Sequence, residues 1–201
     1  MAQPKRQTTE QAFLDFERGS TRKHEYFAGD VFAMAGGTIT HNLIASNTLA
    51  SLHGQVRGTA CRVINSDMRV KIMATGLQTY PDVIILCGQP VFLDDSQDAI
   101  VNPTIVIEVL SPSTERYDRG MKSQHYRTIE TLQEYLLISQ DKYHIEHYRR
   151  QENGQWLFNE AIGIDARLEI PSVTCVLVFK DVYDTVNLTS EDSISTRDSL
   201  S

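Results

Sequence analysis

The sequence lacks any long run of apolar residues. None of its stretches approaches the ~18 consecutive apolar positions that a membrane-spanning helix requires. Near the N-terminus, the basic pair Lys5-Arg6 is not followed by the apolar segment of a secretory signal. We therefore expect a soluble, cytoplasmic protein without a membrane partner.

The chain has only three cysteines, which is an odd number. Cys61, Cys87 and Cys175 are widely spaced, and the first two lie in apolar runs, where a thiol behaves as a small hydrophobic side chain. We expect neither a zinc site nor a disulfide bond.

Positive charge is also in deficit. The chain has 19 Lys and Arg residues against 26 Asp and Glu residues, which gives a formal net charge of -7. Because nucleic acid phosphates attract a positive surface, this balance argues against broad, non-specific binding to nucleic acid. It leaves a local basic cleft open, because basic residues gather in one region: Arg116, Arg119, Lys122 and Arg127.

The length and composition fit one globular domain. With 201 residues, of which 41% are hydrophobic and 22% charged, the chain is large enough to bury a core. We find no internal repeat. We assign residues 1–185 to a single domain and residues 186–201 to a polar tail, whose Ser/Thr/Asp-rich run from Thr189 to Ser201 is expected to be disordered.

The first part of the chain predicts two helices and a hairpin. A short helix capped by Thr8 is expected to end near Gly19. Gly29-Asp30 is typical of the two-residue turn that closes a hairpin. A long amphipathic helix from Thr38 to about His53 is expected to stop at Gly54.

The remaining elements are mostly strands. Residues 61–64 and 68–72 predict two strands, of which the second alternates between apolar and polar residues as a half-exposed strand does. A helix is expected from about Asp118 to Arg127. Later segments predict three further strands and a closing helix, at residues 135–138, 144–148, 155–158 and 176–183.

Two apolar strand-like runs each carry one carboxylate. Asp82 lies at the start of the run 80–86, and Glu108 lies near the end of the run 104–111. Near-continuous apolar runs are typical of the centre of a sheet that is covered on both faces. An unpaired carboxylate in such a strand costs several kcal/mol unless a metal or a charged partner compensates. If the two strands are neighbours, both carboxylates reach one divalent cation.

The residues around these acids favour Mg²⁺ or Mn²⁺. Two carboxylates supply hard oxygen ligands, and neither a nearby cysteine nor a close histidine pair accompanies them. Such an ion lowers the pKa of a bound water and polarises a phosphoryl oxygen. Lys122, in the expected helix, is a candidate for stabilising the developing negative charge. Tyr126 lies four residues later on the same helical face and is a candidate for substrate contact.

The order and spacing of these residues resemble a known family. Pro81-Asp82 followed by Glu108-Val109-Leu110 is similar to the active-site signature of the PD-(D/E)XK nuclease superfamily. More specifically, about residues 10 to 180 resemble the Uma-two-like family of bacterial endonucleases. The segments that carry this likeness are residues 80–83, 108–114, 117–122 and 134–137, together with 25–26, 29–31, 34–37 and 41–42.

The resemblance implies both a fold and an activity. The implied fold is restriction-endonuclease-like, an α/β (α+β) arrangement in which helices flank a mixed central β-sheet. The implied activity is that of an Mg²⁺-dependent or Mn²⁺-dependent endonuclease acting on DNA. Asp82 and Glu108 would then be the metal ligands, and Lys122 would complete the catalytic set.

One position departs from the superfamily pattern. The signature places a lysine two residues after its second acid, where this chain has Leu110. The likeness to members whose lysine lies in the following helix implies that Lys122 replaces it. An alternative stays open, favoured by Leu110 and the acidic charge: a catalytically inactive nucleic-acid-binding or scaffold protein with the same fold. A homodimer is also expected, because nucleases that cut both strands of DNA often pair two sites.

Two further residues are candidates for the cleft. Glu25 starts a predicted hairpin strand, and His41 lies near the start of the first long helix. Each has an ordinary structural interpretation, since polar residues are common at both kinds of position. The same holds for Asp82, which could bond to backbone amides, and for Glu108, which could pair with a nearby arginine.

Overall fold

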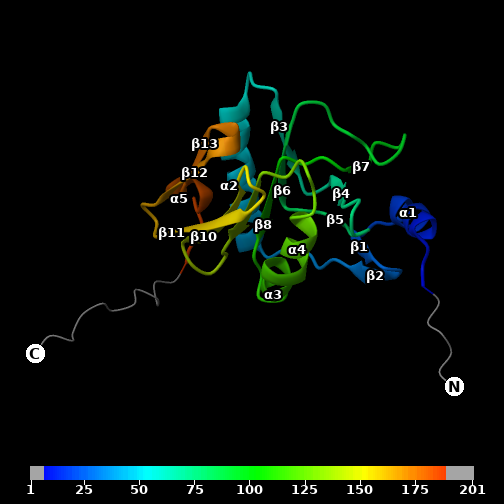
Figure 1. Cartoon of the computed structure of the whole chain (residues 1–201). Helices are drawn as coiled ribbons and strands as arrows, with labels where there is room; N and C mark the ends of the chain where they lie inside the picture. The colour runs from blue at the N-terminus through cyan, green and yellow to red at the C-terminus, as the bar shows by residue number, and fades with distance from the viewer. Residues whose placement is uncertain (1–6, 189–201) are drawn as a thin grey trace, which may run out of the picture.

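A six-stranded mixed β-sheet forms the centre of the protein (Figure 1). The computed structural model describes residues 7–188. The strands of this sheet are β3 (Cys61–Asn65), β6 (Val83–Cys87), β8 (Ile105–Val109), β9 (Glu134–Ile138), β10 (His144–Arg150) and β11 (Trp156–Ile162). They lie in the order β11-β10-β9-β8-β6-β3. Only β8 and β9 run parallel and the other neighbours are antiparallel, which confirms the predicted mixture of directions.

Both faces of this sheet are buried. Alternate residues of a strand point to opposite faces, and accordingly Ile105 and Ile107 of β8 join one core cluster whereas Val106 joins another. The larger core lies beneath α2 (Ile39–Val56), β12 (Arg167–Ile170), β13 (Cys175–Val178) and α5 (Phe179–Val182). The smaller core includes Tyr126 from a helical segment formed by α3 (Glu115–Tyr117), a π-helical turn (Asp118–Lys122) and α4 (Ser123–Tyr126). The central, doubly covered position predicted for the two apolar runs is confirmed.

A second sheet of five short strands lies beside the first. It contains β1 (His24–Phe27), β2 (Asp30–Ala33), β4 (Arg69–Lys71), β5 (Gln78–Thr79) and β7 (Ala99–Ile100). Their order is β2-β1-β5-β4-β7. The helix α1 (Glu10–Gly19) packs on this sheet through a small cluster that includes Phe13 and Tyr26. This sheet brings the β1–β2 hairpin close to the ends of the central strands.

The hairpin turn and the first helix cap each differ by one residue from the prediction. Ala28 and Gly29 form the turn, with φ of 50° and 90°, because Asp30 already pairs within β2. The cap of α1 is Thr9, whose side-chain oxygen accepts the N–H of Ala12 at 3.2 Å, and not Thr8. Local patterns identify these turns well but leave their register open.

The long helix α2 continues past its predicted end. Gly54 lies inside the helix, which ends at Val56. Leu52 and Val56 are both buried in the larger core. Burial of these side chains outweighs the ~1 kcal/mol that a glycine costs in a helix interior, so tertiary packing extends the helix.

The prediction of a half-exposed strand at residues 68–72 was wrong. Every residue of β4 is buried, including Arg69 and Lys71. Arg69 Nη2 lies 3.0 Å from Asp98 Oδ1, and Lys71 Nζ lies 2.5 Å from Glu10 Oε1. Acidic residues from distant segments pair with both cations, so the polar face of this strand is covered instead of solvated.

The predicted closing helix at residues 176–183 was wrong in its first part, residues 176–178. Residues 175–178 form β13, which pairs with β12, and only Phe179–Val182 form the helix α5. The alternating burial of Cys175 and Leu177 shows the two-residue period of a strand. Val186, which was assigned to the tail, is buried in the larger core, and residues 189–201 of the predicted tail lie outside the described residues.

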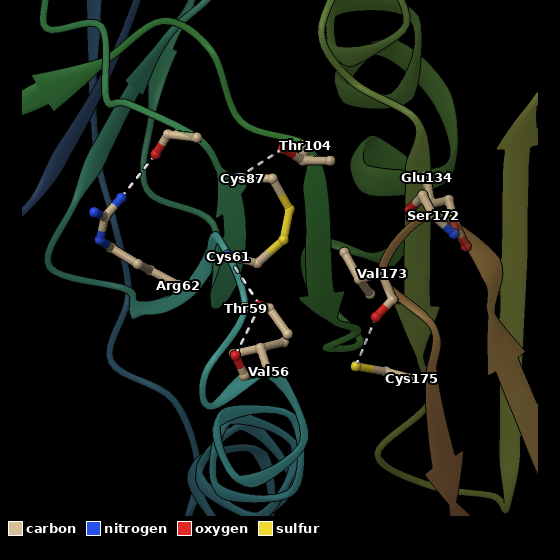
Figure 2. The surroundings of a disulfide bond; sticks show 11 residues. Val56, Thr59, Cys61, Arg62, Cys87, Thr104, Glu134, Ser172, Val173 and Cys175 are labelled. Atoms are coloured by element: carbon tan, nitrogen blue, oxygen red, sulfur yellow. Dashed lines mark hydrogen bonds between the residues drawn. A yellow bond between two sulfur atoms is a disulfide. The ribbon is translucent and has the colours of Figure 1, made fainter.

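The prediction that no disulfide forms is corrected by the structure. Cys61 of β3 and Cys87 of β6 are directly opposite in the antiparallel pair and form a disulfide bond (Figure 2). Their separation of 26 positions in the chain hid this pairing, because strand register brings them together. Cys175 is free, and burial raises the pKa of its thiol.

The helices carry no membrane-spanning signal. Between residues 7 and 188, no helix combines the length and the apolar character needed to cross a bilayer. The longest of them, α2, has 18 residues and includes the polar residues His41 and Asn47.

Candidate active site

The two predicted carboxylates meet at one end of the central sheet. Strands β6 and β8 are antiparallel neighbours, with Val83 opposite Ile107. Continuing this register by one residue places Asp82 opposite Glu108. The condition set by the sequence, that the two strands be neighbours, is therefore met.

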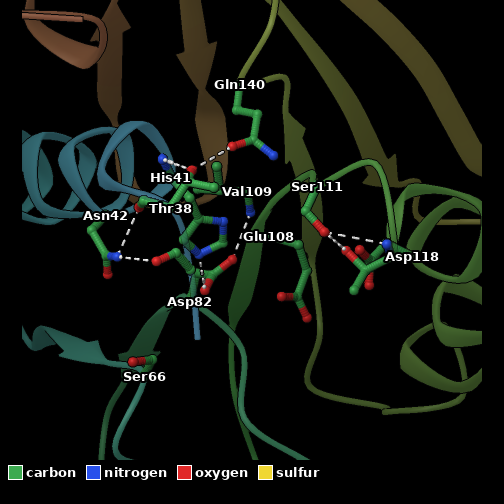
Figure 3. A network of polar contacts seen from close by, with 12 residues as sticks. Thr38, His41, Asn42, Ser66, Asp82, Glu108, Val109, Ser111, Asp118 and Gln140 are labelled. Carbon is green, nitrogen blue, oxygen red and sulfur yellow. Dashed lines mark hydrogen bonds and ion pairs between the residues drawn. The ribbon is translucent and has the colours of Figure 1, made fainter. Parts of the chain in front are cut away.

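Asp82 is held by two hydrogen-bonding partners (Figure 3). Its Oδ2 accepts the backbone N–H of Val109 at 2.7 Å, and its Oδ1 lies 3.0 Å from Nε2 of His41. The first contact is the backbone role considered from the sequence. The second brings a residue of α2 to the site. The side chain of Asp82 remains 17% exposed, so it is accessible from the cavity described below.

His41 is positioned by the start of α2. The side chain of Thr38 caps the helix by accepting the N–H of His41 at 3.1 Å. Gly37 makes room for the ring, because a Cβ atom there would lie 2.6 Å from Cδ2 of His41. The hydrogen bond to Asp82 raises the pKa of His41 above its ordinary value, although burial opposes this shift.

Glu108 is almost completely buried. Its Oε1 lies 3.0 Å from Nζ of Lys122 and accepts the hydroxyl of Tyr126 at 2.7 Å. Burial raises the pKa of Glu108 to about 8, and the negative charges of Asp118 and Asp82 add to the effect of burial, whereas Lys122 opposes it. Lys122, and not one of the nearby arginines considered from the sequence, therefore pairs with this carboxylate.

Lys122 lies among three carboxylates. Its Nζ is 3.0 Å from Glu108, 3.2 Å from Glu25 and 3.5 Å from Asp118. Burial lowers the pKa of Lys122, but the three negative charges outweigh burial and hold the pKa well above its ordinary value. The ammonium group is therefore charged at neutral pH.

The π-helical turn determines which residues face the site. It separates α3 from α4, and the buried residues Asp118, Lys122 and Tyr126 follow at intervals of four. Single π-turns inside helices are rare and occur often at functional sites. The sequence predicted an ordinary helix here and treated Asp118 as a first-turn residue. In the structure Asp118 is buried, its Oδ1 has no hydrogen-bond partner, and burial raises its pKa.

The two further candidates, Glu25 and His41, both lie at the site. Glu25 on β1 is buried, accepts the hydroxyl of Thr79 and contacts Lys122. His41 contacts Asp82, as described. Tyr126 is also at the site, but its side chain is fully buried and its hydroxyl is donated to Glu108, so it supports that carboxylate from behind.

Six of the side chains described above line a cavity of about 530 Å³. Its acidic and basic lining residues are Glu25, His41, Asp82, Glu108, Asp118 and Lys122. A neighbouring cavity of about 510 Å³ shares the wall formed by His41 and Asp82 and extends to Arg22 and Lys23. Four carboxylates against one lysine and one histidine make the first cavity acidic.

The local basic cleft left open by the sequence is not found at this cavity. Arg119 is paired with Glu115 and Glu146, and Arg116 and Arg127 are exposed outside its lining. Two histidines of β10 lie elsewhere, where His147 pairs with Glu134 and His144 pairs with Glu160. Within residues 7–188, no group of three or more His, Cys, Asp or Glu side chains is arranged to hold a metal ion.

Comparison with known proteins identifies the family. Residues 10–177 match Uma2, whose description is "Putative restriction endonuclease". The chain belongs to the Uma2 family. Two similar relatives of this Uma2 chain are uncharacterised proteins of Synechocystis sp. The protein sll1609 is 38% identical over 157 residues, which cover 78% of this chain and 89% of the relative. The protein slr1290 is 36% identical over 171 residues, which cover 85% of this chain and 88% of the relative.

A solved structure has the same fold as this Uma2 chain. It comes from Anabaena variabilis, is titled a "putative nuclease belonging to DUF820" and matches with a TM-score of 0.69 at 19% identity. The match covers 88% of this chain and 98% of the other. The predicted mixed α+β fold is thereby confirmed. The description of the family supports a nuclease-like function.

Proposed function

We propose that this protein is a metal-dependent endonuclease that hydrolyses phosphodiester bonds of DNA. The observation that carries the proposal is the position of Asp82 opposite Glu108, with Lys122 Nζ 3.0 Å from Glu108, at an open cavity. Two acids and a lysine beside a cavity are suited to hydrolysis of a phosphodiester, whose transition state gains negative charge.

The residues fit a hard divalent cation. The cavity has four carboxylates, and only Lys122 and His41 oppose their charge. Burial raises the pKa of Glu108 to about 8, and the negative charges of Asp118 and Asp82 add to this rise. Asp118 Oδ1 accepts no hydrogen bond, and its contact with Lys122 Nζ is long, at 3.5 Å. All candidate donors are oxygen atoms, as Mg²⁺ and Mn²⁺ prefer.

Asp82 and Glu108 would hold the ion. Because no group of three His, Cys, Asp or Glu side chains suited to a metal ion occurs in the described part of the chain, water and a substrate phosphate would complete its ligands, which is the usual arrangement for Mg²⁺. When bound, Mg²⁺ neutralises phosphoryl charge and lowers the pKa of a bound water.

The chain's own residues would orient the reaction. Lys122 keeps a positive charge next to Glu108, where it would stabilise a phosphoryl oxygen or hold the attacking water. His41 and Tyr126 each contact one of the two acids and fix its orientation. Water would attack phosphorus and lose a proton to solvent, and the bond from phosphorus to the leaving oxygen would break, with that oxygen taking up a proton from solvent.

Leu110 explains why the lysine comes from a helix. It lies two residues after Glu108, just past the end of β8, and is buried in the smaller core together with Val106 of that strand. A lysine there would have to enter this apolar cluster. The inactive alternative rests on the same residue, because the strand position used by the superfamily is apolar in this chain.

Cleavage of supercoiled plasmid DNA tests the proposal. We expect nicking or linearisation with Mg²⁺ or Mn²⁺, and a loss of at least ~10²-fold in the Asp82→Ala variant. Asp165→Ala is the matched control, since this aspartate is exposed and pairs with the exposed Lys180. Absence of cleavage by the wild type, or equal rates for the Asp82 variant, would contradict the proposal.

Calorimetric titration with Mn²⁺ separates the active and inactive alternatives. We expect saturable Mn²⁺ binding that is abolished by Glu108→Ala. No binding to the wild type would favour the inactive scaffold.

The proposal also includes the location and the oligomeric state. We expect a cytoplasmic location, because the substrate is DNA, and a homodimer, as predicted from the sequence. Both of these stay predictions.

A further inference from the structure

We propose that the DNA strand at this site is unpaired, and that one of its bases stacks on the ring of Phe32. This inference rests on the proposed function and adds the class of substrate. It concerns a residue that the sequence did not identify, on the hairpin strand β2.

Phe32 and Glu25 are neighbours across the hairpin. They are directly opposite in the antiparallel pair β1–β2, so their side chains lie on the same face, with Cβ atoms about 5 Å apart. Glu25 is 3.2 Å from Lys122, and Figure 1 shows the hairpin beside the α3–α4 segment. Phe32 also lines the cavity that contains Asp82 and Glu108. The aromatic ring therefore stands one side chain away from the candidate catalytic lysine.

The ring of Phe32 is not used by the core. Its exposed fraction is 53%, whereas Phe13 and Phe179 are fully buried. In the part of the chain that the structure describes, Phe32 belongs to none of the three apolar clusters and makes no aromatic contact. An exposed aromatic ring at the wall of a polar cavity is a suitable platform for a nucleobase, because every base has a π-face.

The charges around the cavity disfavour a long duplex. A protein that contacts several phosphates of duplex DNA supplies a lysine or arginine for most of them. Here Lys122 is held by three carboxylates, and Lys23, in the neighbouring cavity, is held by Asp67 at 2.8 Å. Among the described residues that line the two cavities, this leaves the exposed Arg22 as the one lysine or arginine without an ion pair. Much of the affinity must therefore come from contacts other than phosphate pairing, and stacking supplies one of them.

The burial of Glu108 also favours an unpaired strand. Glu108 is only 5% exposed, so a phosphodiester must enter the cavity that Phe32 helps to line in order to reach it. A base inside a duplex is already stacked on both sides and paired, whereas an unpaired nucleotide turns its base toward a side chain without that loss.

Fluorescence anisotropy with the full chain tests the inference. The probes are a 20-nucleotide single strand, the same sequence as a duplex, and a duplex with a central unpaired bulge. Ca²⁺ replaces Mn²⁺, and gels confirm that the probes stay intact. We expect the single strand and the bulge to bind at least about tenfold more tightly than the duplex.

Variants of Phe32 identify the stack. Phe32→Ala should weaken single-strand binding by about 5- to 150-fold, the range found for removal of one base–aromatic stack. Phe32→Tyr keeps the ring and should stay within about twofold of the wild type. Phe158→Ala is the matched control, because Phe158 is 49% exposed but lies on β11, outside the lining of this cavity.

Each outcome bears on one proposal. Equal or tighter binding of the duplex, or equal effects of the Phe32 and Phe158 alanine variants, would overturn the inference. A change of oligomeric state in Phe32→Ala without loss of single-strand binding would also overturn it, and would assign the ring to a protein interface. If Mn²⁺ supports no cleavage while the expected binding pattern holds, the endonuclease proposal fails and the unpaired-strand site stands. If duplex is cut in preference to single strand, the endonuclease proposal stands and the inference fails.

Discussion

At the scale of single residues, the site depends on one buried cation. Lys122 contacts Glu25, Glu108 and Asp118, and all four side chains are nearly inaccessible to water. Removing one partner of a buried ion pair is far more destabilising than removing an exposed pair, because the remaining charge has lost its solvation. The lysine is thus a structural requirement as well as a candidate for catalysis.

The variant Lys122→Met should destabilise the metal-free protein by about 3–5 kcal/mol. It keeps the length of the side chain but leaves three carboxylates without their cation. Urea unfolding measures the change. The control Lys180→Met removes an exposed ion pair with Asp165 and should cost less than ~1 kcal/mol. Equal stabilities of the two variants would show that the charges around Lys122 are solvated.

At the scale of elements, the π-helical turn determines the geometry of the site. The turn Asp118–Lys122 inserts a wider turn between α3 and α4, so that Asp118 and Lys122 face the central sheet together with Tyr126. Hydrophobic periodicity does not reveal such a turn, because a π-turn differs from an α-turn by one residue and the segment is too short for that shift to be recognised.

Deletion of Gly120 should convert this turn to a regular helix and rotate Asp118 away from Lys122. We expect a loss of at least ~10²-fold in DNA cleavage, since small displacements of catalytic groups have effects of that size. Gly120→Ala is the control, because an added Cβ meets nothing within 4 Å and alanine favours a helix. Circular dichroism checks that both variants are folded. Full activity in the deletion variant would rule out a role for the turn.

At the scale of the whole molecule, charge is the dominant feature. The net charge of -7 and an acidic cavity leave few cations for a DNA backbone. The six-stranded sheet nevertheless holds the two acids on rigid, doubly covered strands, so the site is precise although its surroundings repel a polyanion.

The affinity for single-stranded DNA should therefore depend only weakly on salt. With contacts to about one or two phosphates, binding should fall by no more than ~10-fold between about 50 and 200 mM salt. A protein with many phosphate contacts would lose ~10³-fold or more over the same range. Anisotropy titrations at constant Ca²⁺ measure the slope. A steep slope would indicate a basic surface that the cavity does not contain.

The sequence predicted the parts of the fold that depend on local pattern. Apolar runs identified β6 and β8 as central strands, and the strand-end positions of Asp82 and Glu108 were read from the same runs. The sequence did not predict pairings between segments that lie far apart in the chain. The disulfide Cys61–Cys87, the buried cations of β4 and the strand β13 all depend on partners far away in the chain.

The sequence by itself determined the central strands, the two acids and the helical lysine, because alternation and apolar character act within a few residues. Glu25 and His41 were already candidates from the sequence, but the tertiary structure decided that they and Asp118 join the site and that the cavity is acidic. These residues come from β1, α2 and the π-turn, and their charges interact only once the strand order has brought those elements together. Burial then removes the water that would separate the charges, and so converts scattered polar residues into one coupled site.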